Sequence, residues 1–151
     1  MIPPRALLNV VWAAHRALHR WSGGRLGTGR PASANKLGTL FLRSTGRTTG
    51  RIRRNGLFYL DDGRNFVVVA SNAGADHDPA WWRNLQADPR AEVEILATTT
   101  AVAARLATDE ERARNWPRFV AASSQYAAYE GVISRPIPVV ILEPADPGPG
   151  G

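Results

Sequence analysis

The sequence has no cysteine and only three histidines among its 151 residues. The absence of cysteine excludes disulfide bonds, cysteine nucleophiles and thiolate metal sites, and it leaves the redox compartment open. Three histidines, His15, His19 and His77, are too few for a histidine-rich metal cage, so we predict no metal centre. Gly-x-Ser-x-Gly, Walker and Gly-x-Gly-x-x-Gly motifs are also missing, which argues against hydrolase, P-loop and Rossmann chemistry.

Acidic residues are missing from the first 60 positions, which carry eleven Lys or Arg and no Asp or Glu. The remaining positions hold eight basic and thirteen acidic residues, so the net charge of +6 divides into +11 and −5. A biased base composition would explain why eighteen of the nineteen basic residues are Arg, but it would not explain the missing acids. The asymmetry indicates an anionic partner. Three kinds of partner fit it: a phosphorylated cofactor, an anionic membrane surface and nucleic acid.

No apolar run approaches the roughly 20 residues that a membrane-spanning helix needs, and the run 6–14 is too short and too closely followed by charge for a signal peptide. We therefore expect a cytoplasmic protein. After Pro3 and Pro4, apolar residues at helical spacing predict an amphipathic N-terminal helix flanked by Arg5, Arg16 and Arg20. Its apolar stripe either packs on the domain or makes peripheral contact with an anionic membrane.

The chain is expected to contain one domain, because its length is typical of a single core. We divide it into an N-terminal helix and Gly-rich linker (1–36), a barrel domain (37–144) and a flexible tail (145–151). Six segments rich in apolar or β-branched residues predict short strands. These segments are 39–44, 52–60, 65–71, 91–96, 100–107 and 137–143.

Turn and capping residues connect these strands. Asp61-Asp62-Gly63-Arg64 predicts a hairpin between the second and third strands. Asp78 followed by Pro79 predicts the start of a helix that ends before Asp88-Pro89, and Thr108-Asp-Glu-Glu111 predicts a capping box. That second helix runs toward position 123 and is expected to kink or restart at Pro117. The fold class is therefore mainly β (α+β), a small antiparallel barrel with helical crossovers.

The densest functional signal is the segment 43–54, which contains arginines, threonines and two glycines but no acid. Backbone N–H groups in a Gly/Thr loop and forked guanidinium groups suit phosphate or carboxylate oxygens. The alternative is a solvated basic hairpin.

Two further groups of residues are candidates for a binding site. Ser71 and Asn72 follow an apolar strand, and strand ends commonly carry ligand-binding groups. The adjacent Trp81 and Trp82 point in different directions on a helix, so one is expected in the core and the other beside a flat ligand. Tyr126 and Tyr129 share one helical face, either as core residues or as hydrogen-bond donors to a ligand.

The order and spacing of several motifs resemble the deazaflavin (coenzyme F420)-dependent nitroreductase and quinone reductase family. The resemblance rests on Thr45-Gly-Arg-Thr-Thr-Gly50, Asp78-Pro-Ala-Trp-Trp-Arg-Asn-Leu85, Asp88-Pro89, Trp116-Pro117 and Arg135-Pro-Ile-Pro138. It implies a split β-barrel oxidoreductase that takes hydride from reduced coenzyme F420 and gives it to a quinone, nitro compound or other activated unsaturated acceptor. It implies no nucleic-acid partner, and a monomer or a homodimer.

The same resemblance implies the site residues. Tyr126, Tyr129 and Ser71 would be catalytic or line the acceptor pocket. The cofactor-binding residues would be Arg47, Thr48, Thr49, Arg53, Arg54, Asn55, Gly56, Leu57, Phe58, Val69, Ala70, Ser71, Asn72, Ala80, Trp81, Trp82, Arg83, Asn84 and Tyr126.

The chain departs from the family pattern at four positions. It has Thr48 and Asn72 where members commonly carry basic residues, Gly56 where they carry proline, and Ser123 where the prototype nitroreductase has a further tyrosine. The loss of two cationic positions leaves Arg51 and Arg54 as substitutes. The alternatives to coenzyme F420 reduction are a split barrel that binds FMN or a lipid without this activity, and a basic module that binds membranes or nucleic acid.

Overall fold

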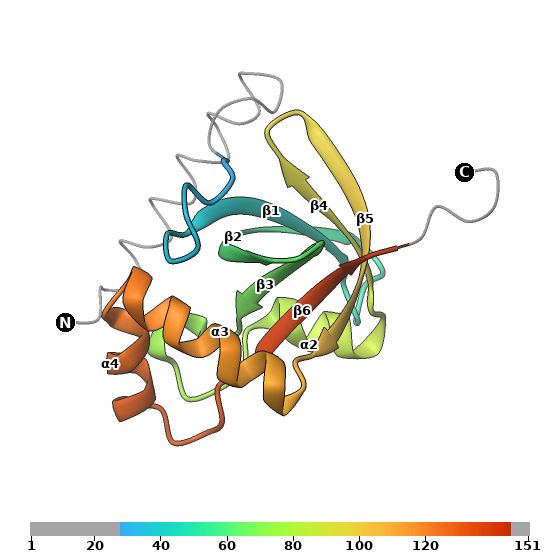
Figure 1. The fold of residues 1–151 in the computed structure, drawn as a ribbon. Helices are drawn as coiled ribbons and strands as arrows, with labels where there is room; N and C mark the ends of the chain where they lie inside the picture. Colours follow the sequence, from blue (N-terminus) through green and yellow to red (C-terminus); the bar gives the residue numbers. More distant parts are fainter. Residues whose placement is uncertain (1–27, 146–151) are drawn as a thin grey trace.

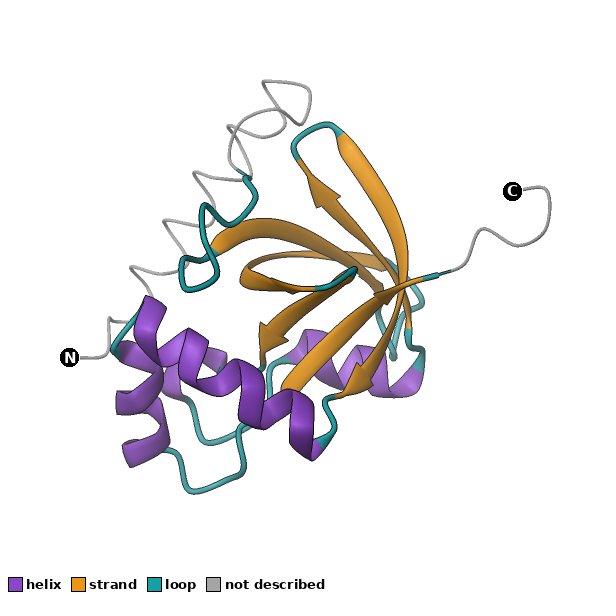
Figure 2. Ribbon diagram, in the orientation of Figure 1, coloured by secondary structure: helices purple, strands orange, loops and turns teal. Residues whose placement is uncertain are grey.

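The computed structural model describes residues 28–145, which form a six-stranded antiparallel barrel with three α-helices (Figures 1 and 2). The strands are β1 (Gly38–Thr45), β2 (Ile52–Asp62), β3 (Asn65–Val69), β4 (Arg90–Ile95), β5 (Thr98–Leu106) and β6 (Val139–Pro144). They close in the order β1-β2-β3-β6-β5-β4, because β1 also pairs with β4. The predicted fold class and the six strands are confirmed.

The β2–β3 hairpin and the start of α3 form where local sequence signals predicted them. Asp62 pairs with Asn65 across the two-residue loop Gly63-Arg64, and Gly63 adopts the positive φ (62°) that this turn requires. The capping box is also present: Thr108 Oγ1 accepts from the Glu111 N–H at 3.2 Å, and Glu111 Oε1 accepts from the Thr108 N–H at 2.9 Å.

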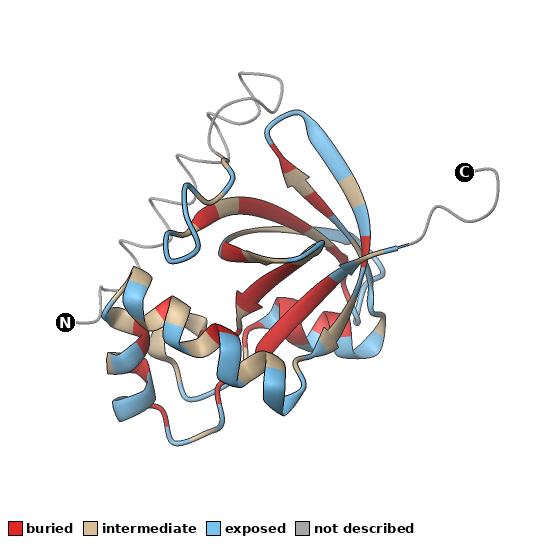
Figure 3. Ribbon diagram, in the orientation of Figure 1, coloured by how far each residue is buried: buried red, intermediate tan, exposed pale blue. Residues whose placement is uncertain are grey.

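The core has two parts because several strands are buried on both faces. Inside the barrel, Leu40, Phe66 and Leu142 pack with the tryptophans of α2 (Ala80–Ala87), which covers one end of the barrel. Outside it, alternate residues of β3 and β6 pack against α3 (Asp109–Ala122) and α4 (Gln125–Val132). Figure 3 shows this buried layer between the strands and the helices. Double burial explains the continuous apolar runs of β3 and β6.

Two helix predictions need correction. The helix α3 does not restart at Pro117 but continues through it to Ala122. Tertiary packing outweighs the missing proline N–H, because Phe119, two residues further on, is fully buried. The N-cap of α2 is Pro79 rather than Asp78, since the Asp78 carboxylate is drawn away to the guanidinium of Arg135, 2.7 Å distant.

Strand ends also differ from the predicted ones. β3 ends at Val69 rather than at residue 71, because Ser71 begins the single-turn 3-10 helix η1 (Asn72–Gly74). β6 begins at Val139, after Pro138, which cannot donate to a ladder. The expected N-terminal amphipathic helix, most of its linker and the end of the tail lie outside the described residues. Between residues 28 and 145, no helix is long and apolar enough to cross a membrane.

Candidate active site

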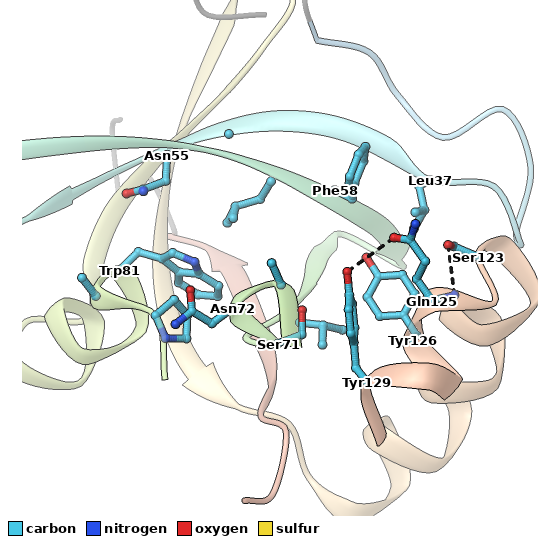
Figure 4. Close-up of a pocket in the computed structure, with 16 residues that line it drawn as sticks. Leu37, Asn55, Phe58, Ser71, Asn72, Trp81, Ser123, Gln125, Tyr126 and Tyr129 are labelled. Carbon is cyan, nitrogen blue, oxygen red and sulfur yellow. Dashed lines mark hydrogen bonds between the residues drawn. The ribbon is translucent and has the colours of Figure 1, made fainter. Parts of the chain in front are cut away.

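The described residues form two adjoining cavities between the barrel and the helices. The first, here called the aromatic cavity, has a volume of about 430 Å³ and lies between β2, η1, the start of α2 and α4. Its lining residues are Leu37, Asn55, Gly56, Leu57, Phe58, Val69, Ser71, Asn72, Ala73, Pro79, Ala80, Trp81, Ser123, Gln125, Tyr126 and Tyr129. In Figure 4, Asn55 and Trp81 lie at one end of this cavity, and Tyr126, Tyr129 and Gln125 at the other.

The second cavity, the arginine cavity, has a volume of about 480 Å³ and lies beside the loop that joins β1 to β2. Its lining residues are Gly46, Arg47, Thr48, Thr49, Ile52, Arg53, Arg54, Asn55, Ala80, Trp81 and Asn84. Three of them, Asn55, Ala80 and Trp81, also line the aromatic cavity. A single elongated ligand with a flat end and an anionic end would therefore span both.

Tyr126 lies at the α4 end of the aromatic cavity and is fixed by aromatic packing. Its ring makes edge-on contacts with Phe119 (5.1 Å between centroids), Tyr129 (5.8 Å) and Trp116 (6.2 Å). Its hydroxyl has no hydrogen-bond partner in the part of the chain that is described, and it lines the cavity. Burial raises the pKa of Tyr126 far above its ordinary value, so the hydroxyl stays protonated at neutral pH. Tyr126 can thus donate a hydrogen bond to a ligand.

Tyr129 lies one helical turn further on, and its hydroxyl donates to Gln125 Oε1 at 3.4 Å. Burial also raises the pKa of Tyr129. Ser71 also lines this cavity and is 8% exposed. These residues give the cavity several polar groups on otherwise apolar walls, the usual composition of a small-molecule site.

The loop that edges the arginine cavity is a tight turn closed by glycines. The Gly46 N–H donates to the Arg51 carbonyl at 2.7 Å, and Gly50 has a positive φ of 73°. The loop is tied to α2 through Asn84, whose Oδ1 accepts from the Arg47 backbone N–H (3.2 Å) and from Arg47 Nη1 (2.8 Å). Because Asn84 is only 4% exposed, it anchors the loop firmly.

The five arginines of the basic segment fall into three groups, because Arg51 has no carboxylate partner among the described residues and lines neither cavity. Arg54 pairs with Glu94 at 2.9 Å and lies over the Phe41 ring, and Arg43 also lies 3.5 Å from Glu94. Arg47 and Arg53 have no carboxylate partner among the residues described here and line the arginine cavity. Two of the three arginines of this segment that no carboxylate neutralises therefore lie where an anionic ligand would bind.

Most of the predicted site residues line one cavity or the other, but three of them do not. Ala70 is fully buried in the barrel core, and Arg83 is exposed on α2. Trp82 contributes to a separate cavity on the other side of α2, so Trp81 is the tryptophan that lines the candidate site. The roles expected of the lining residues remain predictions.

Sequence reasoning did not assign several lining residues to the site. These are Leu37, Ala73, Pro79, Ser123 and Gln125 in the aromatic cavity, and Gly46 and Ile52 in the arginine cavity. Gln125 could have been found, because it lies four positions before Tyr129 on one helical face. Leu37 could not, since only the closing of the barrel brings it to α4.

Fold and site together define a split-barrel protein with a site for a flat ligand carrying an anionic tail. The residues fit a deazaflavin with a phosphorylated, glutamate-bearing side chain, since an aromatic cavity adjoins one lined by two arginines that have no carboxylate partner among the described residues. The profile of the F420H(2)-dependent quinone reductase family matches residues 12–144. The chain belongs to this family of oxidoreductases, in which coenzyme F420 is the cofactor.

Relatives and solved structures agree with this assignment. The F420H(2)-dependent quinone reductase Rv1261c of Mycobacterium tuberculosis is 34% identical over 131 residues, 85% of this chain and 86% of that protein. Rv3178 of the same organism is 38% identical over 106 residues, 70% of this chain and 89% of that protein. The structure of the F420-H2 dependent reductase FDR-A superposes with a TM-score of 0.64 at 30% identity, covering 70% of this chain and 93% of that one.

Proposed function

We propose that this chain reduces a quinone at the aromatic cavity, with coenzyme F420 bound across both cavities. The observation that carries the proposal is the continuity of the two cavities through Asn55, Ala80 and Trp81. The relatives named as quinone reductases support the choice of acceptor. When bound, the reduced deazaflavin supplies the hydride.

The arginine cavity would hold the phosphate and glutamate groups of the cofactor tail. Arg47 and Arg53 offer forked donors that suit these oxygens, and the hydroxyls of Thr48 and Thr49 add neutral donors. Arg54 contributes less charge, since Glu94 neutralises much of it. The tail-binding part of the site therefore depends mainly on two arginines.

The aromatic cavity would hold the deazaflavin ring and the acceptor. The side chains of Leu57, Phe58, Val69 and Trp81 supply apolar walls. As hydride reaches a quinone, negative charge develops on its oxygen, and the hydroxyl of Tyr126 is a donor that can stabilise this charge. Tyr129 and Gln125 shape the acceptor end of the cavity. The protein thus contributes orientation, exclusion of water and a hydrogen bond, and it needs no nucleophile.

Steady-state oxidation of reduced coenzyme F420 by a soluble quinone tests this function. We expect quinone-dependent loss of the reduced deazaflavin absorbance, with little activity when reduced FMN replaces it. Equal or greater turnover with FMN would favour the second candidate, a split barrel for another flavin. Thr48 and Asn72, which stand at positions commonly basic in the family, are the observation that favours that candidate. Lipid retention without turnover would favour a non-catalytic binding role.

The cellular location and a contact with the membrane are also proposals. We propose a cytoplasmic protein whose N-terminal segment makes peripheral contact with anionic membranes, supported by the basic amphipathic pattern of residues 5–20. Removal of residues 1–27 should then abolish sedimentation with anionic liposomes and preserve turnover of a soluble quinone. Sedimentation that does not change would exclude this anchor.

A monomer or a homodimer is expected, and light scattering at several concentrations distinguishes them. A solved structure described as a domain-swapped dimer, 28% identical with a TM-score of 0.68, covers 89% of this chain and 96% of that one. A concentration-independent mass larger than that of a dimer would contradict the expectation.

A further inference from the structure

One arginine outside both cavities binds several backbone groups in and around one wall of the aromatic cavity. Arg135 follows α4, and its side chain is 14% exposed. Its Nη2 donates to the carbonyls of Ala70 (3.2 Å), Ser71 (3.1 Å) and Ala75 (3.2 Å), and its Nε donates to Ala75 at 3.3 Å. Its Nη1 donates to Asp78 Oδ1 at 2.7 Å.

The segment that Arg135 holds has an unfavourable backbone conformation. Asn72, Ala73 and Gly74 have consecutive positive φ angles of 50°, 54° and 87°. Such angles are uncommon for residues other than glycine, and they persist where the surroundings over-determine them. Within the turn, the N–H of Gly74 donates to the Ser71 carbonyl and the N–H of Ala75 donates to the Asn72 carbonyl, each at 3.1 Å, and Asn72 Nδ2 donates to the His77 carbonyl at 3.0 Å. Arg135 binds the carbonyls on both sides of this turn.

The turn is also a wall of the candidate site. Ser71, Asn72 and Ala73 line the aromatic cavity, and Figure 4 shows Ser71 and Asn72 on the side opposite Phe58. The same guanidinium also binds Asp78. Asp78 directly precedes Pro79 and the start of α2, which line the cavity. Arg135 thereby links the end of β3, the η1 turn and the approach to α2.

We propose that Arg135 is a positioning residue, which holds residues 71–75 in the conformation that forms one wall of the aromatic cavity. The proposal rests on the proposed function only for the identity of the ligand. A lysine would keep the charge opposite Asp78 but would lack the planar fork that reaches several carbonyls at once. The arginine cavity makes no contact with Arg135, so the two cavities should respond differently to its loss.

The test compares the full-length wild type with Arg135→Lys, Arg135→Gln and a control, Arg112→Lys. Arg112 also donates to a backbone carbonyl of the 133–138 connection, that of Ile137 at 2.6 Å, but it does not bind the turn. The first measurement is amide hydrogen exchange without any ligand. In both Arg135 variants, we expect the Gly74 and Ala75 amides to exchange at least tenfold faster, while β1 and β4 keep wild-type rates and Arg112→Lys behaves as wild type.

The second measurement is fluorescence titration with the tail-free deazaflavin, 8-hydroxy-5-deazariboflavin, and with coenzyme F420 over a range of salt. Both Arg135 variants should bind the tail-free compound about tenfold more weakly, with the salt dependence of coenzyme F420 binding unchanged. Wild-type exchange at residues 74 and 75, or faster exchange spread over the whole barrel, would overturn the proposal. Faster local exchange with unchanged affinity would overturn the positioning role. If the wild type binds neither compound, the proposed function fails, and the exchange result still decides the role of Arg135.

Discussion

Replacing Tyr126 with phenylalanine should separate catalysis from packing. The Tyr126 hydroxyl has no partner within residues 28–145, so its removal leaves no protein group unpaired. The ring contacts with Phe119, Tyr129 and Trp116 are kept. The free energy of unfolding should therefore change by no more than about 0.5 kcal/mol.

The expected kinetic effect of Tyr126→Phe is much larger. A hydrogen bond to a charged group contributes about 1.5 to 3 kcal/mol, which corresponds to roughly a 10- to 150-fold loss of kcat. The affinity for coenzyme F420 should change less than kcat, because the bond strengthens only as charge develops on the acceptor.

Three measurements check this expectation: steady-state oxidation of reduced coenzyme F420 at full cofactor occupancy, titration of the cofactor, and thermal unfolding. The matched control is Tyr129→Phe, which loses the 3.4 Å bond to Gln125 and should shift KM among quinones of different size. An unchanged kcat for Tyr126→Phe, or a loss of kcat fully explained by weaker cofactor binding, would refute the reasoning.

Other predictions concern the arginine cavity and the helix cap. Arg47→Ala and Arg53→Ala should each weaken cofactor binding by about 1.5 to 3 kcal/mol and reduce its salt dependence. The control Arg51→Ala should change neither, because Arg51 lines neither cavity. Equal titrations for all three variants would remove this cluster from the site. Asn84→Ala should weaken the binding of coenzyme F420 more than that of the tail-free deazaflavin. The variant removes no charge, but it releases the loop that carries Arg47, which is expected to bind the tail. The hydrogen bonds from Arg105 lower the pKa of Glu111 from 4.5 to about 2, so this carboxylate stabilises the fold above pH 4.5 by on the order of 1 kcal/mol, and the stabilisation is lost as pH falls toward 2. Denaturant unfolding of Glu111→Gln should show this difference from wild type at pH 6 but not near pH 2; a constant difference would contradict it.

The barrel could be predicted because its signals are local. The Asp-Gly turn at Gly63 and the capping box of Thr108 depend on residues a few positions apart, and both form as expected. The doubly buried parts of β3 (66–69) and β6 (139–142) are continuously apolar, so these strands were also recognisable. Strand ends were less accurate, since Ser71 leaves the ladder where no proline or glycine marks the change.

The features of the site that the sequence did not predict depend on tertiary contacts. Asp78 has the sequence context of an N-cap, but Arg135, 57 residues away, takes its carboxylate. Asn84 was expected to contact the cofactor, and in the structure it also anchors Arg47 across 37 residues. The basic segment indicated an anion site. Only the pairing of β1 with β4 shows that Glu94 neutralises Arg54, which leaves Arg47 and Arg53 as the cavity-lining arginines without a carboxylate partner among the described residues.

The central claim is that one ligand occupies both cavities, with its ring beside Trp81 and its anionic tail beside Arg47. Comparing the wild-type affinities for coenzyme F420 and for 8-hydroxy-5-deazariboflavin, each between low and high salt, tests this claim most directly. We predict that coenzyme F420 binds at least tenfold more tightly at low salt and loses this advantage as salt rises, while the tail-free compound is nearly insensitive to salt. Equal affinities with equal salt dependence would contradict the account, because the arginine cavity would then not hold the tail.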